Sequence, residues 1–203
     1  KLRWWSAYVK AYQQFYKAKR NVPAYQQFLN EQKFNQTSSQ GLRSLFASVP
    51  FTDKENYVKK YSIEQRCVNA CIPDNEVVID ESSGSSGIAM NWVRGKYERE
   101  TNGKIIQLGI RTLYPKEPLF VINAFALGPW ATGVNVTMSC VKFSKLKSLG
   151  PDKAKIINTL NYFGNSHHYL IMGYPPFLKS LVETSEIDWQ SYNITLIFGG
   201  ESM

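Results

Sequence analysis

The stretch EVVIDESSGSSG, residues 76–87, decides the fold because it joins a strand pattern to a loop of small residues. The segment Glu76–Asp80 carries valine and isoleucine side chains, which favour a β-strand. Ser82–Gly87 contains only serine and glycine. Glycine permits positive φ, and bare backbone N–H groups together with serine hydroxyls can surround an anion. We interpret the segment as a loop that binds the phosphates of ATP, and the alternative is a flexible Ser/Gly connector.

Downstream of this loop, strand and helix patterns alternate along the chain. Ile105–Leu113 fits both an alternating strand and a helical face, and we favour the helix because the charged residues before it continue the same turn pattern. The alternation predicts an α/β fold with a mostly parallel sheet. We place His167 and His168 in a surface loop, and the alternative is that one of them faces a nucleotide or acyl group. The predicted strands lie at 76–80, 88–93, 119–125, 169–173 and 194–198, and the other helices at 151–163 and from Pro175 onward.

Upstream of the loop, the sequence predicts a helical N-terminal lobe. Apolar side chains recur at steps of three and four over residues 2–18, and a Val-Pro pair separates that helix from a second one at 23–33. Two capping-box signals predict short helices, namely 52–61 from Thr52 with Glu55, and 62–71 from Ser62 with Gln65. The chain therefore divides into a helical lobe at 1–75 and an α/β portion at 76–203.

The composition indicates a globular chain of 203 residues, of which 43% are hydrophobic and 20% charged. No apolar run approaches the roughly 18 residues that span a bilayer, so we predict no membrane segment. The chain has three cysteines, Cys67, Cys71 and Cys140, which are too few for a disulfide framework. No further cysteine or histidine that could ligate a metal lies near Cys67 and Cys71 in the sequence. We interpret them as buried thiols of a cytoplasmic protein, and we assign no metal ligands.

The formal net charge of +8 is concentrated in residues 1–35, where Glu31 is the sole acidic residue. A basic patch of this kind can bind nucleic acid or an acidic partner. We favour a solvated helix face, because charge runs on amphipathic helices usually face water. A basic, non-catalytic binding module is therefore the alternative from a different functional class.

Segments in consecutive order resemble the N-terminal part of the adenylate-forming enzyme superfamily, and within it the phenylacetate–coenzyme A ligases. The central match is Ser82–Gly87, which is similar to the family's SSGTTG phosphate loop. The other matches are Pro23-Ala24-Tyr25, Val49–Lys54, Ala126–Gly133, Gly173-Tyr174-Pro175 and Phe198–Glu201. Together they extend over residues 23–201. The loop departs from the family pattern after Gly87, because the usual Gly-Lys-Pro is replaced by Ile88-Ala89-Met90.

The resemblance implies ATP-dependent activation of a carboxylic acid to an acyl-adenylate, followed by transfer to a thiol. It implies ATP, Mg²⁺ and coenzyme A as cofactors, with a carrier-protein thiol as the alternative acceptor and a homo-oligomer as a compatible assembly. Ser82, Ser83, Gly84, Ser85, Ser86 and Gly87 would bind the ATP phosphates. The vicinity of the adenine would be formed by Gly199, Gly200 and Glu201, and the acyl pocket by Phe125, Gly128 and Trp130. No catalytic residue is assigned, and we expect an N-terminal portion that is inactive alone.

Overall fold

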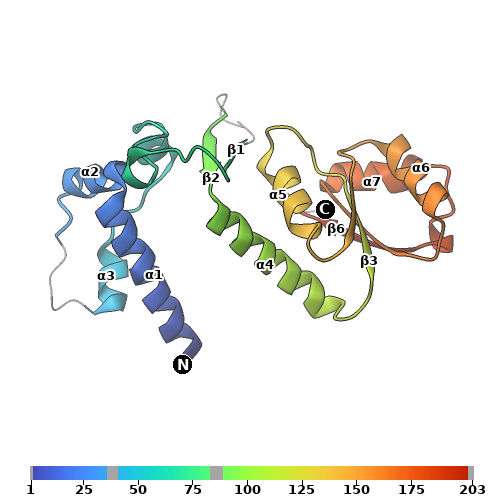
Figure 1. Ribbon diagram of the computed structural model, residues 1–203, viewed down its shortest axis with the longest axis horizontal. Coiled ribbons are helices and arrows are strands. Elements are labelled where there is room, and N and C mark those ends of the chain that lie inside the picture. The colour runs from blue at the N-terminus through green and yellow to red at the C-terminus, as the bar shows by residue number, and fades with distance from the viewer. Residues whose placement is uncertain (1, 36–40, 83–88, 201–203) are drawn as a thin grey trace. The chain divides into compact units, whose positions relative to one another are not determined.

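The computed structural model describes residues 2–35, 41–82 and 89–200 (Figure 1). It divides the chain into two compact units, each of which we describe by itself. The helical unit comprises residues 1–77 with 90–93, and the α/β unit comprises residues 78–89 with 94–203.

Within its described residues, the helical unit is built from α-helices and two shorter helical turns. Val22 is extended and Pro23 opens the second helix, as the sequence predicts, because proline disfavours helical geometry in the residue before it. The elements are α1 (Leu2–Asn21), α2 (Pro23–Glu31), α3 (Leu42–Ser48), the π-helical turn η1 (Lys54–Val58) and the 3-10 turn η2 (Val68–Ala70). Their core is aromatic, with Phe15, Phe28 and Tyr61 buried among leucine and tyrosine side chains.

The two predicted capping boxes have different outcomes. At the first, the structure has the helical turn η1 at Lys54–Val58 instead of a helix at 52–61. Asp53 rather than Thr52 caps this turn, because its side chain accepts from Asn56 N at 2.7 Å and the Asn56 side chain returns the bond. At the second, Gln65 N donates to Ser62 Oγ at 3.3 Å, so the box is present. The prediction of a helix at 62–71 is nevertheless wrong. The chain forms turns and η2 instead, because Asn69 takes a left-handed φ of 56°.

The α/β unit contains a four-stranded sheet with the order β4-β3-β5-β6. All of its strand pairs are parallel, which confirms the predicted α/β class. Its strands are β3 (Leu119–Asn123), β4 (Lys145–Ser148), β5 (His168–Gly173) and β6 (Asn193–Phe198). Every residue of β3 and β5 is buried, as expected for central strands covered on both faces.

Helices cover both faces of this sheet (Figure 1). One face packs against α4 (Lys96–Leu113) and α5 (Ala131–Cys140) through Val121, Leu170 and Val136. The opposite face packs against α6 (Lys153–Phe163) and α7 (Pro175–Thr184) through Ile122, Ile171 and Leu178. Alternation along each strand sends neighbouring side chains to opposite faces, so the two cores are distinct. The ambiguous segment 105–113 is helical, as predicted.

Two shorter strands flank the Ser82–Gly87 segment. β1 (Val78–Glu81) precedes it and β2 (Asn91–Arg94) follows it, close to the predicted strands at 76–80 and 88–93.

His168 is the first residue of β5 and is buried, so its predicted position in a surface loop is wrong. Its Nε2 atom lies 2.9 Å from Thr195 Oγ1. Its Nδ1 atom lies 2.9 Å from Glu117 Oε1. The Tyr114 ring meets the imidazole edge to face, with ring centres 4.8 Å apart. These contacts lie at the amino end of the sheet and hold its strands to the preceding loop.

Candidate functional site

The candidate site lies at the carboxyl ends of β3 and β5. After β3 the chain crosses to α5 on one face of the sheet, whereas after β5 it crosses to α7 on the other face. Adjacent parallel strands whose connections diverge in this way leave a crevice outside their carboxyl ends, where ligands of α/β proteins bind. The strand ends are close together, since Ala124 N donates to Met172 O at 2.7 Å.

Asn123, the last residue of β3, organises this edge and is fully buried. Its side-chain nitrogen lies within hydrogen-bonding distance of Gly133 O at 2.8 Å, Thr137 Oγ1 at 2.9 Å and Ser148 Oγ at 3.0 Å. Its Oδ1 atom accepts from Phe125 N at 3.1 Å. One amide therefore joins the end of β3, the first turns of α5 and the end of β4. Such a satisfied buried network makes the edge rigid.

The loop after β3 folds back closely against the start of α5. A Cβ atom added at Gly133 would lie 2.0 Å from Ala126 O, a distance that no side chain tolerates. Gly128, within the same loop, has a φ of +82°, which favours glycine. At the end of the loop, Pro129 O accepts from Glu81 N at 2.8 Å. The loop therefore contacts the last residue of β1, directly before Ser82.

The loops after β5 and β6 meet at Tyr174. Gly173 ends β5, and a Cβ atom there would lie 3.1 Å from Leu178 and 3.3 Å from Ala124, so its lack of a side chain permits this approach. Gly200 follows β6 with a φ of +108°, and an added Cβ atom would lie 3.2 Å from the Tyr174 ring. Tyr174 is 40% exposed, so an aromatic ring beside bare backbone faces solvent at this edge.

An ion pair links the two chain segments that flank Ser82–Gly87. Arg94 Nε lies 3.2 Å from Oδ2 of Asp80, whose side chain is 1% exposed. Arg94 also binds Glu98 in the first turn of α4. Burial lowers the pKa of Arg94, but the hydrogen bond and charge of Glu98 and the charge of Asp80 raise it more. The net effect is a raised pKa, so the arginine remains a cation beside the buried carboxylate.

The structure brings some of the predicted site residues together. Ser82 follows β1, next to the loop that carries Gly128 and Trp130, and Trp130 is 37% exposed. Phe125, predicted to line an acyl pocket, is 9% exposed and packs in the core between the sheet and α5. Gly199 and Gly200 lie after β6, on the far side of β5. Most of the predicted phosphate loop, Ser83 to Gly87, and Glu201 lie outside the described residues.

Sequence reasoning missed Asn123, Tyr174 and the pair of Asp80 with Arg94. A signal for the first was present, because Asn123 is the lone polar residue of an apolar strand run. The ion pair joins positions 14 residues apart and carried no local signal.

Two kinds of feature are absent from the described ranges, 2–35, 41–82 and 89–200. No group of three or more His, Cys, Asp or Glu side chains there could hold a metal ion. Nor does any helix in these ranges combine the length and apolar character needed to cross a bilayer.

Comparison with solved structures shows that the chain has the fold of part of a CoA ligase. No family model and no curated protein matches the sequence. The structural match includes an open conformation of 2-hydroxyisobutyryl-CoA ligase in complex with 2-HIB-AMP and CoA, with a TM-score of 0.75 and 16% identity. It covers 97% of this chain and 47% of that chain.

Two further structures of the same ligase give similar comparisons. In the thioesterification state with 2-HIB-AMP and CoA, the TM-score is 0.76 at 17% identity, covering 97% of this chain and 43% of that one. In the postadenylation state with 2-HIB-AMP, the TM-score is 0.69 at 16% identity, covering 96% and 42%. This chain therefore spans less than half the length of each ligase chain, and the likeness shows the fold.

Proposed function

We propose that this chain is the N-terminal portion of an adenylate-forming acid–thiol ligase. The parent protein would use ATP to convert a carboxylic acid to an acyl-adenylate and transfer the acyl group to a thiol. The observation that carries the proposal is the divergence of the chain connections after β3 and β5 to opposite faces of the sheet, in a chain that has the fold of a CoA ligase over 97% of its length.

The residues at this edge suit the groups of ATP. Ser82–Gly87 would donate hydroxyl and backbone N–H groups to the phosphates, where negative charge grows as pyrophosphate leaves. Gly199, Gly200 and Glu201 would lie near the adenine, and the exposed Tyr174 ring beside Gly200 offers an apolar surface for the base. Magnesium would arrive with the phosphates, which, with water, supply most ligands of Mg²⁺ in such sites.

For the acid, we propose a specificity like that of phenylacetate–coenzyme A ligases, with coenzyme A as the thiol. Trp130 is partly exposed on the loop after β3, so its indole could contact an aryl or acyl group, with Gly128 allowing close approach. Phe125 would support that wall from within the core. A carrier-protein thiol is the alternative acceptor.

A basic binding module is the alternative of another class, favoured by the net charge of +8. Titration of the 203-residue chain with ATP and, separately, with a DNA oligonucleotide at several salt concentrations distinguishes the two. We expect saturable ATP binding. DNA binding with a steep salt dependence and no response to ATP would contradict the ligase proposal.

A matched pair of variants tests the loop itself. Ser85→Asp introduces a negative charge where phosphate should bind, and Ser6→Asp introduces the same charge on the exposed face of α1. Both change the net charge equally, so non-specific attraction falls equally. We expect about tenfold weaker ATP binding for Ser85→Asp alone, which corresponds to about 1.4 kcal/mol. Equal losses in both variants would mean that the loop does not bind the phosphates.

A further inference from the structure

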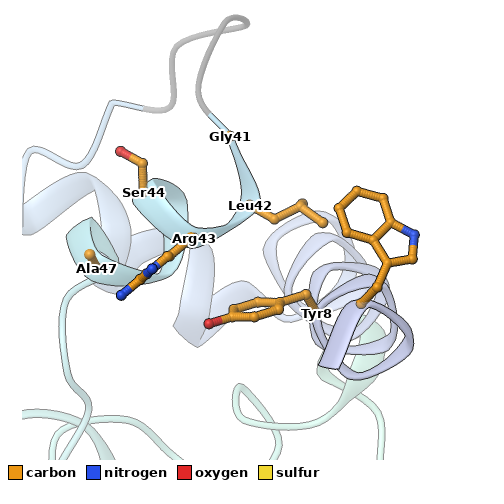
Figure 2. A pocket seen from close by; sticks show the side chains of 7 residues that line it. Tyr8, Gly41, Leu42, Arg43, Ser44 and Ala47 are labelled. Atoms are coloured by element: carbon orange, nitrogen blue, oxygen red, sulfur yellow. The ribbon is translucent and has the colours of Figure 1, made fainter. Parts of the chain in front are cut away.

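A separate pocket of about 700 Å³ lies in the helical unit, between α1 and α3 (Figure 2). Its walls come from Trp5, Tyr8, Gly41, Leu42, Arg43, Ser44 and Ala47. All of these residues belong to the helical unit. Its volume falls within the range of small-molecule sites, which is about 300–1,000 Å³.

The walls of the pocket are mainly apolar. Leu42 and Ala47 contribute aliphatic groups from α3, and the Tyr8 ring contributes an aromatic face from α1 (Figure 2). The Trp5 indole remains 64% exposed although it lines the pocket. Aromatic side chains supply large apolar contact areas, so covering this indole with a ligand would release much ordered water.

Two polar groups accompany these walls, the Tyr8 hydroxyl and the Arg43 guanidinium. In Figure 2, the Tyr8 hydroxyl points toward the side of α3 from which Arg43 extends, whereas the Ser44 hydroxyl points away from it. Neither Tyr8 nor Arg43 has a hydrogen bond or ion pair within the part of the chain that the structure describes. A guanidinium with a free planar edge binds a carboxylate through paired N–H donors.

We propose that this pocket binds an amphipathic monocarboxylate, a molecule with an aryl or alkyl body and a single carboxylate. The apolar body would lie against Trp5, Leu42 and the Tyr8 ring, and the carboxylate would accept from Arg43 and the Tyr8 hydroxyl. One arginine matches one negative charge. Among the described residues, the lining contains no second cation, whereas a nucleotide would bring several charges.

Phenylbutyrate is a suitable probe because it joins a phenyl ring to a carboxylate through a short alkyl chain. We would titrate it into the 203-residue chain by calorimetry and compare its uncharged amide, phenylbutyramide. Arg43→Gln removes the cation, Trp5→Ala removes the indole, and Lys10→Gln is a matched control because Lys10 is exposed on the same helix outside the pocket lining. Far-UV circular dichroism verifies the folding of each variant.

We expect saturable binding of phenylbutyrate that weakens about tenfold in Arg43→Gln and in Trp5→Ala, and stays within twofold in Lys10→Gln. The amide should bind about tenfold more weakly than the acid. Binding that is absent, or equally tight in Arg43→Gln, would overturn the proposal. A lipid membrane also combines apolar chains with anionic groups, so we would measure binding to anionic phosphatidylglycerol vesicles in a second experiment. Vesicle binding without phenylbutyrate binding would also overturn it.

Discussion

Replacing Arg94 by methionine tests whether the ion pair beside the Ser82–Gly87 segment stabilises the α/β unit. The variant leaves the carboxylate of Asp80, which is 1% exposed, without its cation. At 3.2 Å and an effective dielectric constant of about 20, two unit charges attract by about 5 kcal/mol. Arg94 is 27% exposed, and the desolvation of Asp80 offsets part of this attraction. We therefore expect Arg94→Met to lower the free energy of unfolding by about 3 kcal/mol.

Urea unfolding, followed by circular dichroism and Trp fluorescence, measures this loss in a double-mutant cycle. Asp80→Leu with Arg94→Met removes both charges and should recover most of the stability, because no buried charge is left unpaired. Lys179→Met is the control, since its pair with Glu183 is exposed and 3.9 Å long, and we expect a change within about 0.5 kcal/mol. A coupling energy below about 0.5 kcal/mol between Asp80 and Arg94 would refute the reasoning.

Three further substitutions have expected outcomes. Gly133→Ala should destabilise by about 2 kcal/mol or more in thermal unfolding, because its Cβ atom would lie 2.0 Å from a carbonyl oxygen. Gly109→Ala is the comparison, because an added Cβ atom there meets open space in the middle of α4, and it should stabilise by about 0.5–1 kcal/mol. An equal loss of stability in Gly109→Ala and Gly133→Ala would contradict the steric explanation. Burial raises the pKa of Cys140 to about 11, above its ordinary value. The buried neutral thiol therefore contributes fully to the free energy of unfolding below about pH 9, and this contribution is lost as pH rises through about 11. Cys140→Ala should flatten that alkaline decline in urea unfolding. Cys71 is exposed, so its predicted burial is wrong, and native Cys140 should alkylate more slowly than Cys71 at pH 8. Equal labelling rates would contradict the burial of Cys140.

The parallel sheet was predictable because its central strands carry continuous apolar runs. Leu119–Asn123 and His168–Gly173 are buried on both faces, and burial on both faces leaves a strong pattern in the sequence. β4 was missed because Lys145 and Lys147 alternate with less polar residues at a sheet edge, and such a short segment resembles a loop. The positions of β3 and β5 were therefore predictable, because burial on both faces selects apolar residues along the whole strand.

α5 was not predicted, because its residues have weak intrinsic helix preference. The segment ATGVNVTMSC contains glycine, threonine, asparagine and valine, which reduce local helix stability. The helix forms because Val136 and Cys140 pack against the sheet, and because Gly133 O and Thr137 Oγ1 bond to Asn123. Both contacts join residues distant in sequence, so no local pattern could predict them.

The candidate site was also predictable only in part. The sequence could identify segments rich in serine and glycine, because a loop that approaches a ligand or another backbone needs small residues. It could not predict that Glu81 pairs with Pro129, or that Gly200 lies against Tyr174, since both contacts join segments distant in the sequence.

The shared amide of Asn123 has an evolutionary consequence. Thr137 and Ser148 bond to it and to each other, with their hydroxyl oxygens 2.6 Å apart. A lineage that replaces one of these three residues by an apolar one removes a hydrogen-bond partner from each of the other two. Substitutions at positions 123, 137 and 148 should therefore occur together among natural homologues, and libraries that randomise the three positions jointly should contain more folded members than libraries that vary one at a time.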